Sequence, residues 1–238
     1  MNLYKNILNE FSLLKNEEKI KIFKRFFKTK KGEYGEGDEF LGITVPLIRD
    51  LSRKYIELEY SDIKKLLENK YHEIRLCALI ILTYKFEKYK KEKNENELKY
   101  IYNFYLENIK YINNWDLVDL SCYKIIGEYL LNKDRSILEE LSISKNLWER
   151  RIAIISTFAF IKNNEYKDTV KICEILLNDK QELIHKATGW MLREMGKRIN
   201  KELLINFLNK YYKKMPRIML RYSIERLNND EKAFYMKK

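Results

Sequence analysis

The segment Trp-Glu-Arg-Arg-Ile-Ala-Ile at residues 148–154 has a counterpart at residues 72–79, His-Glu-Ile-Arg-Leu-Cys-Ala-Leu, and each would open the second helix of a helical pair. Looser echoes follow at residues 184–190 and 218–223. The segments are 75, 34 and 35 residues apart when aligned on Ala78, Ala153, Ala187 and Tyr222, and the first gap has room for two units. Helix pairs that repeat every 35–45 residues or so are typical of HEAT-like and armadillo-like arrays. An irregular bundle with chance spacing is the alternative.

The composition also favours helices. The 238 residues include only two prolines and seven glycines, and apolar residues recur at three-and-four spacing. We therefore expect an all-α fold, a superhelical array of antiparallel helix pairs with a basic concave groove. Residues 1–238 would form a single HEAT-like repeat domain, in which residues 29–42, holding four of the glycines, form a loop insertion. This loop has no Gly-Lys-Ser/Thr and follows no strand, so it matches neither a P-loop nor a dinucleotide-binding turn.

Charge and cysteine content limit the environment. The formal net charge of +12 favours a polyanionic partner, nucleic acid before anionic membrane, although biased coding composition also produces lysine-rich chains. No apolar run reaches the roughly 18 residues of a membrane span. The three cysteines, Cys77, Cys122 and Cys173, lie far apart in apolar runs and are expected to be buried free thiols of a reducing compartment. We expect a cytoplasmic monomer, associated with the nucleoid when it acts on DNA.

The N-terminal part gives local helix signals. Residues 2–15 and 17–29 are predicted to form a helical hairpin, with Asn16 as a possible cap between them. Pro46 would stand in the first turn of a helix that runs to about Tyr55. Residues 113–123 begin with two asparagines suited to N-capping and are predicted to form an amphipathic helix. On that helix Trp115 and Asp119, four residues apart, would share one face.

An indole beside a carboxylate suits chemistry on a cationic centre, although a core tryptophan below a solvated aspartate is the simpler interpretation. A second candidate cluster is Trp190 with Lys186 and Arg193 on a predicted helix over residues 183–198. Arg150 and Arg151 begin another helix, where they oppose the helix dipole unless an anion or a carboxylate is near. Trp148 has apolar neighbours and is predicted to be a core residue. Neither His72 nor His185 has partners at metal-ligand spacing, so we expect no metal site.

Several of these motifs together resemble the DNA alkylation repair family, the AlkD-like DNA glycosylases. They are Trp115-Asp116-Leu117-Val118-Asp119, Trp148-Glu149-Arg150-Arg151-Ile152-Ala153 and residues 186–194, Lys-Ala-Thr-Gly-Trp-Met-Leu-Arg-Glu. The loop at residues 31–42 and the segment at residues 215–222 are similar as well, so that the resemblance runs from about residue 20 to residue 227.

The resemblance implies hydrolysis of the N-glycosidic bond of cationic N3- or N7-alkylated purines in duplex DNA, for base excision repair and without a metal or organic cofactor. Asp119 would be the catalytic carboxylate, and Trp115 and Trp190 would face the deoxyribose. Arg151 would contact DNA, and we expect Arg150, Lys186 and Arg193 to do so too. The tyrosine that lines the site from the second helix in the best-known type is replaced by Phe26 or Phe27, and Tyr34 is a possible substitute.

The chemistry fits these residues, because an alkylated purine already carries positive charge and leaves behind an oxocarbenium-like sugar. A carboxylate stabilises that cation and orients or deprotonates a water, and indole faces favour nearby positive charge. Two other functions remain open. One is a non-catalytic HEAT-like protein that binds branched or distorted DNA, and the other is a HEAT-like protein-binding scaffold.

Overall fold

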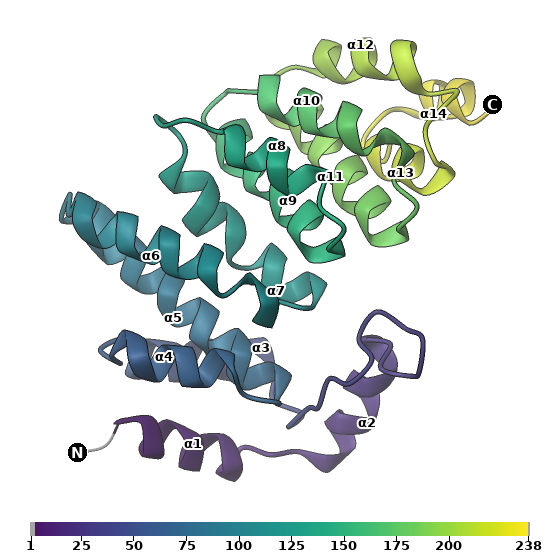
Figure 1. Cartoon of the computed structure of the whole chain (residues 1–238). Coiled ribbons are helices and arrows are strands. Elements are labelled where there is room, and N and C mark those ends of the chain that lie inside the picture. Colours follow the sequence, from purple (N-terminus) through teal and green to yellow (C-terminus); the bar gives the residue numbers. More distant parts are fainter. Residues whose placement is uncertain (1–2, 238) are drawn as a thin grey trace. The chain divides into compact units, whose positions relative to one another are not determined.

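In a computed structural model, residues 3–237 are described, and they form helices with no strand among them (Figure 1). The predicted all-α fold is therefore confirmed. The chain divides into two compact units, Met1–Ser121 and Cys122–Lys238. The single domain, the superhelical repeat and the concave groove stay predictions.

The first unit is built around one long helix, α5 (His72–Lys91), in which residues 72–83 are all buried. The run Leu-Cys-Ala-Leu-Ile-Ile-Leu at residues 76–82 is apolar on every face, as is typical of a core helix, and α5 packs against α3, α4, α6 and α7. The other elements of this unit are α1 (Leu3–Leu13), α2 (Glu17–Phe26), α3 (Val45–Lys54), α4 (Tyr60–Leu67), α6 (Glu95–Glu107), the 3-10 turn η1 (Ile109–Tyr111) and α7 (Trp115–Asp119).

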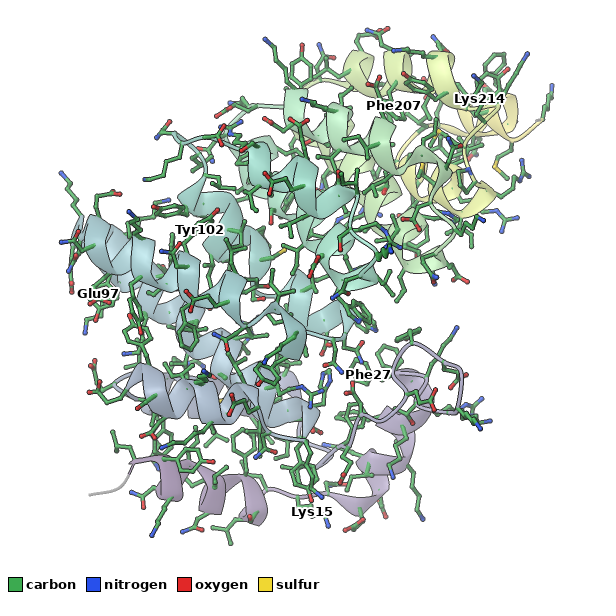
Figure 2. The ribbon with its side chains drawn as sticks, viewed as in Figure 1. Lys15, Phe27, Glu97, Tyr102, Phe207 and Lys214 are labelled. Carbon is green, nitrogen blue, oxygen red and sulfur yellow. The ribbon has the colours of Figure 1, made fainter. Side chains whose placement is uncertain are left out.

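The helix signals of the N-terminal part are confirmed. The Asn16 side chain accepts a hydrogen bond from the backbone N–H of Lys19 and so caps α2. Pro46 stands in the first turn of α3, and Tyr55 follows its end. Residues 29–42 are irregular, as predicted. Phe27, which follows α2 directly, is labelled where this irregular segment begins (Figure 2).

The predicted helix over residues 113–123 is wrong in length. Asn114 caps α7 by accepting a hydrogen bond from the N–H of Trp115, but the helix ends at Asp119. The hydroxyl of Ser121 donates to the carbonyl of Leu117, and the N–H of Ser121 reaches back only to Val118. A serine hydroxyl that bonds to the preceding turn competes with the regular ladder of the helix, so the last turn tightens and the helix stops.

The second unit is built around two helices, α9 (Leu147–Lys162) and α11 (Glu182–Arg198), which pack against each other. Gly189 lets α13 approach α11, because a Cβ there would stand 2.5 Å from the Met219 carbonyl oxygen. The four residues used for the repeat alignment lie in α5, α9, α11 and α13, as predicted. The remaining elements are the π-helical turn η2 (Tyr123–Gly127), α8 (Ser136–Ser142), α10 (Lys167–Ile175), the 3-10 turn η3 (Leu176–Asn178), α12 (Lys201–Tyr211), α13 (Arg217–Ser223) and α14 (Asn229–Met236).

Two further predictions about the core are confirmed. Trp148 is buried. Cys77, Cys122 and Cys173 are buried free thiols. Across residues 3–237 no helix is both long and apolar enough to span a membrane.

Candidate functional site

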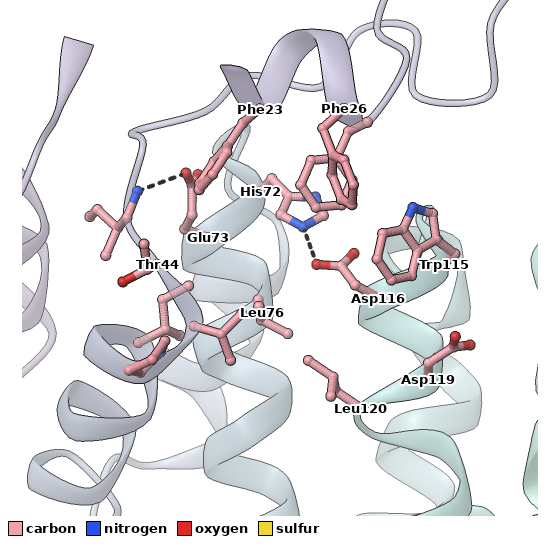
Figure 3. Close-up of a pocket in the computed structure, with 15 residues that line it drawn as sticks. Phe23, Phe26, Thr44, His72, Glu73, Leu76, Trp115, Asp116, Asp119 and Leu120 are labelled. Carbon is pink, nitrogen blue, oxygen red and sulfur yellow. Dashed lines mark hydrogen bonds and ion pairs between the residues drawn. The ribbon is translucent and has the colours of Figure 1, made fainter. Parts of the chain in front are cut away.

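The first unit contains a pocket of about 460 Å³ that Trp115 and Asp119 both line (Figure 3). Its walls come from α2, the chain leading into α3, the start of α5, and α7. The lining residues are Phe23, Phe26, Phe27, Ile43, Thr44, Val45, Pro46, Ile48, His72, Glu73, Leu76, Trp115, Asp116, Asp119 and Leu120. The pocket is mainly apolar, its ionisable side chains are three carboxylates and one imidazole, and no lysine or arginine contributes to it.

The Trp115 indole is held by two phenylalanines at the end of α2. It stacks on the ring of Phe27, with ring centroids 5.5 Å apart and an interplanar angle of 22°. Phe26 meets it edge-on at 5.8 Å. Phe27 is buried, whereas Phe26 is 59% exposed. One aromatic ring thus fixes the indole from inside the unit while the other lies at the surface.

The two aspartates of α7 that line the pocket have different surroundings. Asp116 is buried, and its Oδ2 lies 2.8 Å from Nε2 of His72. Asp119, three residues later, is only partly buried. Figure 3 shows Asp116 turned toward His72 and Asp119 turned away from it. The Asp116 carboxylate is therefore enclosed within the unit, and the Asp119 carboxylate is the more accessible of the two.

His72 belongs to a buried polar network that joins three segments of the chain. Its Nδ1 lies 3.4 Å from Asp38, which follows the glycine-rich part of the loop. The other carboxylate oxygen of Asp38 accepts a hydrogen bond of 2.6 Å from Arg75, and the Asn114 amide donates to Asp38 at 2.9 Å. Because Asn114 also caps α7, the network ties the loop and the start of α5 to the helix that carries Trp115 and Asp119.

Opposite charges in this network stabilise the charged forms of His72 and Asp38. Burial alone would lower the pKa of His72, but the charge and hydrogen bond of Asp116 and the hydrogen bond of Asp38 outweigh it and raise the pKa to about 9. Burial would likewise raise the pKa of Asp38, yet its hydrogen bond to His72 and the charge of Arg75 lower it to about 2. At neutral pH the network therefore contains an imidazolium between two carboxylates. The rings of Phe27 and Phe40 lie 4.8 and 4.9 Å from the imidazole, in a geometry that favours a cation.

Glu73 anchors the chain that leads into α3. Its buried carboxylate accepts hydrogen bonds from the backbone N–H groups of Leu41, Gly42 and Ile43. Gly42 adopts a φ of +78°, and a Cβ on it would stand 2.2 Å from the carbonyl oxygen of Asn16. Because glycine has no Cβ, the end of the loop packs directly against the start of α2. This contact helps to fix the position of α2 and therefore of Phe26.

The predicted site residues of the second unit are largely engaged with other residues of that unit. Trp190 is partly buried and packs on Phe158, with ring centroids 5.9 Å apart. Arg151 is only 5% exposed and donates to the carbonyl of Leu183. The other three cations form ion pairs: Arg150 with Asp179 at 2.6 Å, Lys186 with Glu182 at 2.5 Å, and Arg193 with Glu225 and Glu194. Arg150 at the start of α9 thus has the carboxylate that its position requires.

Two other candidates from the sequence lie near the pocket. Phe26 is at its rim, whereas Tyr34 is not among the lining residues and places its hydroxyl 3.5 Å from the Phe26 carbonyl oxygen. No three or more His, Cys, Asp or Glu side chains within residues 3–237 are grouped so that they could hold a metal ion.

Known proteins resemble this chain in sequence and in fold. A family model described as DNA alkylation repair enzyme matches residues 7–227. The chain belongs to the DNA alkylation repair enzyme family. This assigns it to alkylation repair, with DNA as the partner. A solved structure described as "Predicted DNA alkylation repair enzyme from Enterococcus faecalis" is similar with a TM-score of 0.68, over 90% of this chain and 97% of that chain. The two are 17% identical, so this likeness shows the fold. No curated protein matches.

The sequence analysis missed the buried network of this alkylation repair protein. His72 was considered only as a metal ligand, and Asp38, Glu73 and Asp116 were not singled out. Asp38 and Asp116 lie 34 and 44 residues from His72 along the chain, so no local spacing reveals the cluster. The signal that was available is a charged pair, His72-Glu73, directly before the long apolar run of α5.

Proposed function

We propose that this member of the family is a DNA glycosylase that hydrolyses the N-glycosidic bond of cationic N3- or N7-alkylated purines in duplex DNA. One observation carries the proposal, namely that Trp115 and Asp119 line the same pocket from one face of α7. A partly exposed carboxylate beside an aromatic surface suits a reaction in which positive charge moves from the base to the sugar. The carboxylate-lined pocket, which has no lysine or arginine, adds to the preference for cations.

In the proposed mechanism the alkylated base leaves without protonation, because it already carries a positive charge. The Asp119 carboxylate stabilises the oxocarbenium-like sugar and orients or deprotonates the attacking water. Trp115, held by Phe27, presents its indole to the sugar, and we assign the same role to Trp190 from the family resemblance. No step in this scheme uses a metal or an organic cofactor.

The proposal is tested by measuring base release from duplex DNA that carries N7-methylguanine or N3-methyladenine. We expect release by the wild type and a loss of about 10²–10³-fold in rate for Asp119→Asn, with DNA binding retained. The matched control is Glu68→Gln, which neutralises an exposed carboxylate of the same unit outside the pocket and should leave release unchanged.

Two results would contradict the glycosylase proposal. One is DNA binding without release above the spontaneous rate, which would favour the non-catalytic binder of branched or distorted DNA. The other is full release by Asp119→Asn, which would remove this carboxylate from the mechanism.

A further inference from the structure

A run of positive charge lies beside the pocket, in residues 19–31, which we call the basic segment. It reads Lys-Ile-Lys-Ile-Phe-Lys-Arg-Phe-Phe-Lys-Thr-Lys-Lys, with seven cations and no acidic residue, whereas the whole chain has 47 Lys and Arg to 35 Asp and Glu. A coding bias toward lysine would act throughout the chain and would not remove acidic residues from one segment. The concentration of charge therefore calls for a local explanation.

These cations are accessible, unlike those predicted to bind DNA. Lys21, Lys24 and Arg25 are exposed on α2, and Lys30 and Lys31 are exposed in the loop. Within residues 3–237, none of these five forms an ion pair with a carboxylate. Arg150, Lys186 and Arg193, by contrast, are all paired with carboxylates of the second unit. The basic segment is thus better placed to neutralise an external anion.

The arrangement on α2 also favours an anionic partner. Lys21, Lys24 and Arg25 occupy positions i, i+3 and i+4, so they share one helix face. Like charges at this spacing destabilise an isolated helix. The helix dipole favours only those of the last turn, and Glu17 in the first turn attracts Lys21 and Lys24. A row of phosphates would offset the repulsion along the whole face.

The basic segment adjoins the pocket through Phe26. This ring is exposed and yet contacts the Trp115 indole at 5.8 Å between centroids. An anion held at the C-terminal end of α2 by Arg25, the residue directly before Phe26, would lie near this edge of the pocket that contains Trp115 and Asp119. The pocket itself has carboxylates but no lysine or arginine. The phosphates of a nucleic acid must therefore be bound by residues outside the pocket.

We propose that the exposed cations of the basic segment hold the phosphates of duplex DNA next to the pocket, and that this surface is the main backbone anchor of the first unit. The inference rests on the proposed function only for DNA as the partner, because binding does not require base release. Exposed Ile22 and Phe26 beside the cations would also suit an anionic membrane, and the experiment separates the two partners.

The test compares two triple variants with equal loss of charge. Lys21→Gln/Lys24→Gln/Arg25→Gln removes the face on α2, and Lys64→Gln/Lys93→Gln/Lys99→Gln removes three exposed lysines elsewhere in the same unit that also form no ion pair with residues 3–237. The dissociation constant for undamaged duplex DNA is measured at several salt concentrations. The α2 variant should bind on the order of tenfold more weakly, and its slope of log affinity against log salt should fall by about 3, since each lost phosphate contact removes about 0.9. The control should change less than about twofold in affinity.

Thermal unfolding of both variants checks that they are folded, and binding to vesicles of phosphatidylcholine with phosphatidylserine tests the membrane alternative. Equal weakening of DNA binding by both variants would overturn the proposal, because it would show a general charge effect. Unchanged DNA binding by the α2 variant would overturn it too, including when vesicle binding is lost. If wild type releases no base yet the α2 variant alone loses DNA affinity, the glycosylase proposal fails and the anchor stands.

Discussion

His72 Nε2 lies 2.8 Å from Asp116 Oδ2, and this buried contact joins α5 to the helix that carries both Trp115 and Asp119. The imidazole also reaches Asp38 in the loop. Removing one partner of a buried ion pair leaves an uncompensated charge, which is strongly destabilising. The network therefore fixes the pocket wall most firmly while His72 is protonated.

The stability of the protein should fall at alkaline pH because of His72. Its folded pKa, about 9, is raised above the unfolded value of about 6.5. The stabilisation is therefore complete below about pH 6.5 and is lost as the pH rises through 9. The shift corresponds to about 3 kcal/mol. Urea unfolding between pH 6 and pH 9.5 should show this decline in the wild type and a flatter profile in His72→Gln.

Cysteine thiols also lower the stability at alkaline pH, equally in both proteins. Burial raises the pKa of Cys77 to about 12, so thiols exposed on unfolding add a decline above about pH 8.5 in both proteins. The difference between wild type and His72→Gln isolates the imidazole. Parallel pH profiles for the two proteins would show that His72 is not the source.

The two pocket aspartates of α7 should lose different amounts of stability on the same substitution. Asp116→Asn removes the charge that faces protonated His72 and should lower the free energy of unfolding by about 3 kcal/mol. Asp119→Asn changes a carboxylate that is only partly buried and should lower it by about 1 kcal/mol, the ordinary cost of a single substitution. Urea unfolding of both variants at pH 7 measures this directly. A larger loss for Asp119→Asn would give that carboxylate a structural role.

Phe26→Tyr should raise base release without altering stability. The ring is 59% exposed at the rim of the pocket, so a hydroxyl is added without burying a polar group. One new hydrogen bond to the substrate is worth about 1 kcal/mol, or about fivefold in rate. Single-turnover release from N7-methylguanine DNA measures the effect. Phe234→Tyr, on a ring of similar exposure in α14, is the control. An equal gain in this variant would show that the effect does not depend on the place of Phe26 at the pocket.

Local patterns predicted local structure well in this chain. Asn16, Pro46 and Asn114 marked helix starts because capping depends on neighbouring residues alone. Trp115 and Asp119 line one pocket because a spacing of four residues holds them on one helix face. The carboxylate partner of Arg150, Asp179, is 29 residues away along the chain. Arg193 pairs with its neighbour Glu194 and also with Glu225, which is 32 residues away. Pairings between residues far apart in the chain depend on how helices pack, which local patterns do not reveal. The sequence therefore predicted that these arginines bind DNA, although both are paired with carboxylates in the structure.

Alanine at Gly42, at the end of the loop, should destabilise the protein more than alanine at Gly37. Gly42 and Gly37 both have positive φ, +78° and +87°, so alanine is strained at either position. They differ in space: a Cβ on Gly37 meets nothing within 4 Å, whereas one on Gly42 would stand 2.2 Å from the backbone oxygen of Asn16. Gly37→Ala should therefore cost about 1–2 kcal/mol, and Gly42→Ala about 3 kcal/mol or more, because backbone atoms must move as well.

Urea unfolding compares the stability of the two glycine variants, and base release measures the functional consequence at Trp115. The displaced backbone belongs to the start of α2, whose far end presents Phe26 and Phe27 to the indole. Gly42→Ala should therefore also slow base release, whereas Gly37→Ala should leave it unchanged. Equal losses of stability would mean that backbone strain alone matters at Gly42. A Gly42→Ala protein with full activity would show that the position of α2 does not depend on this contact.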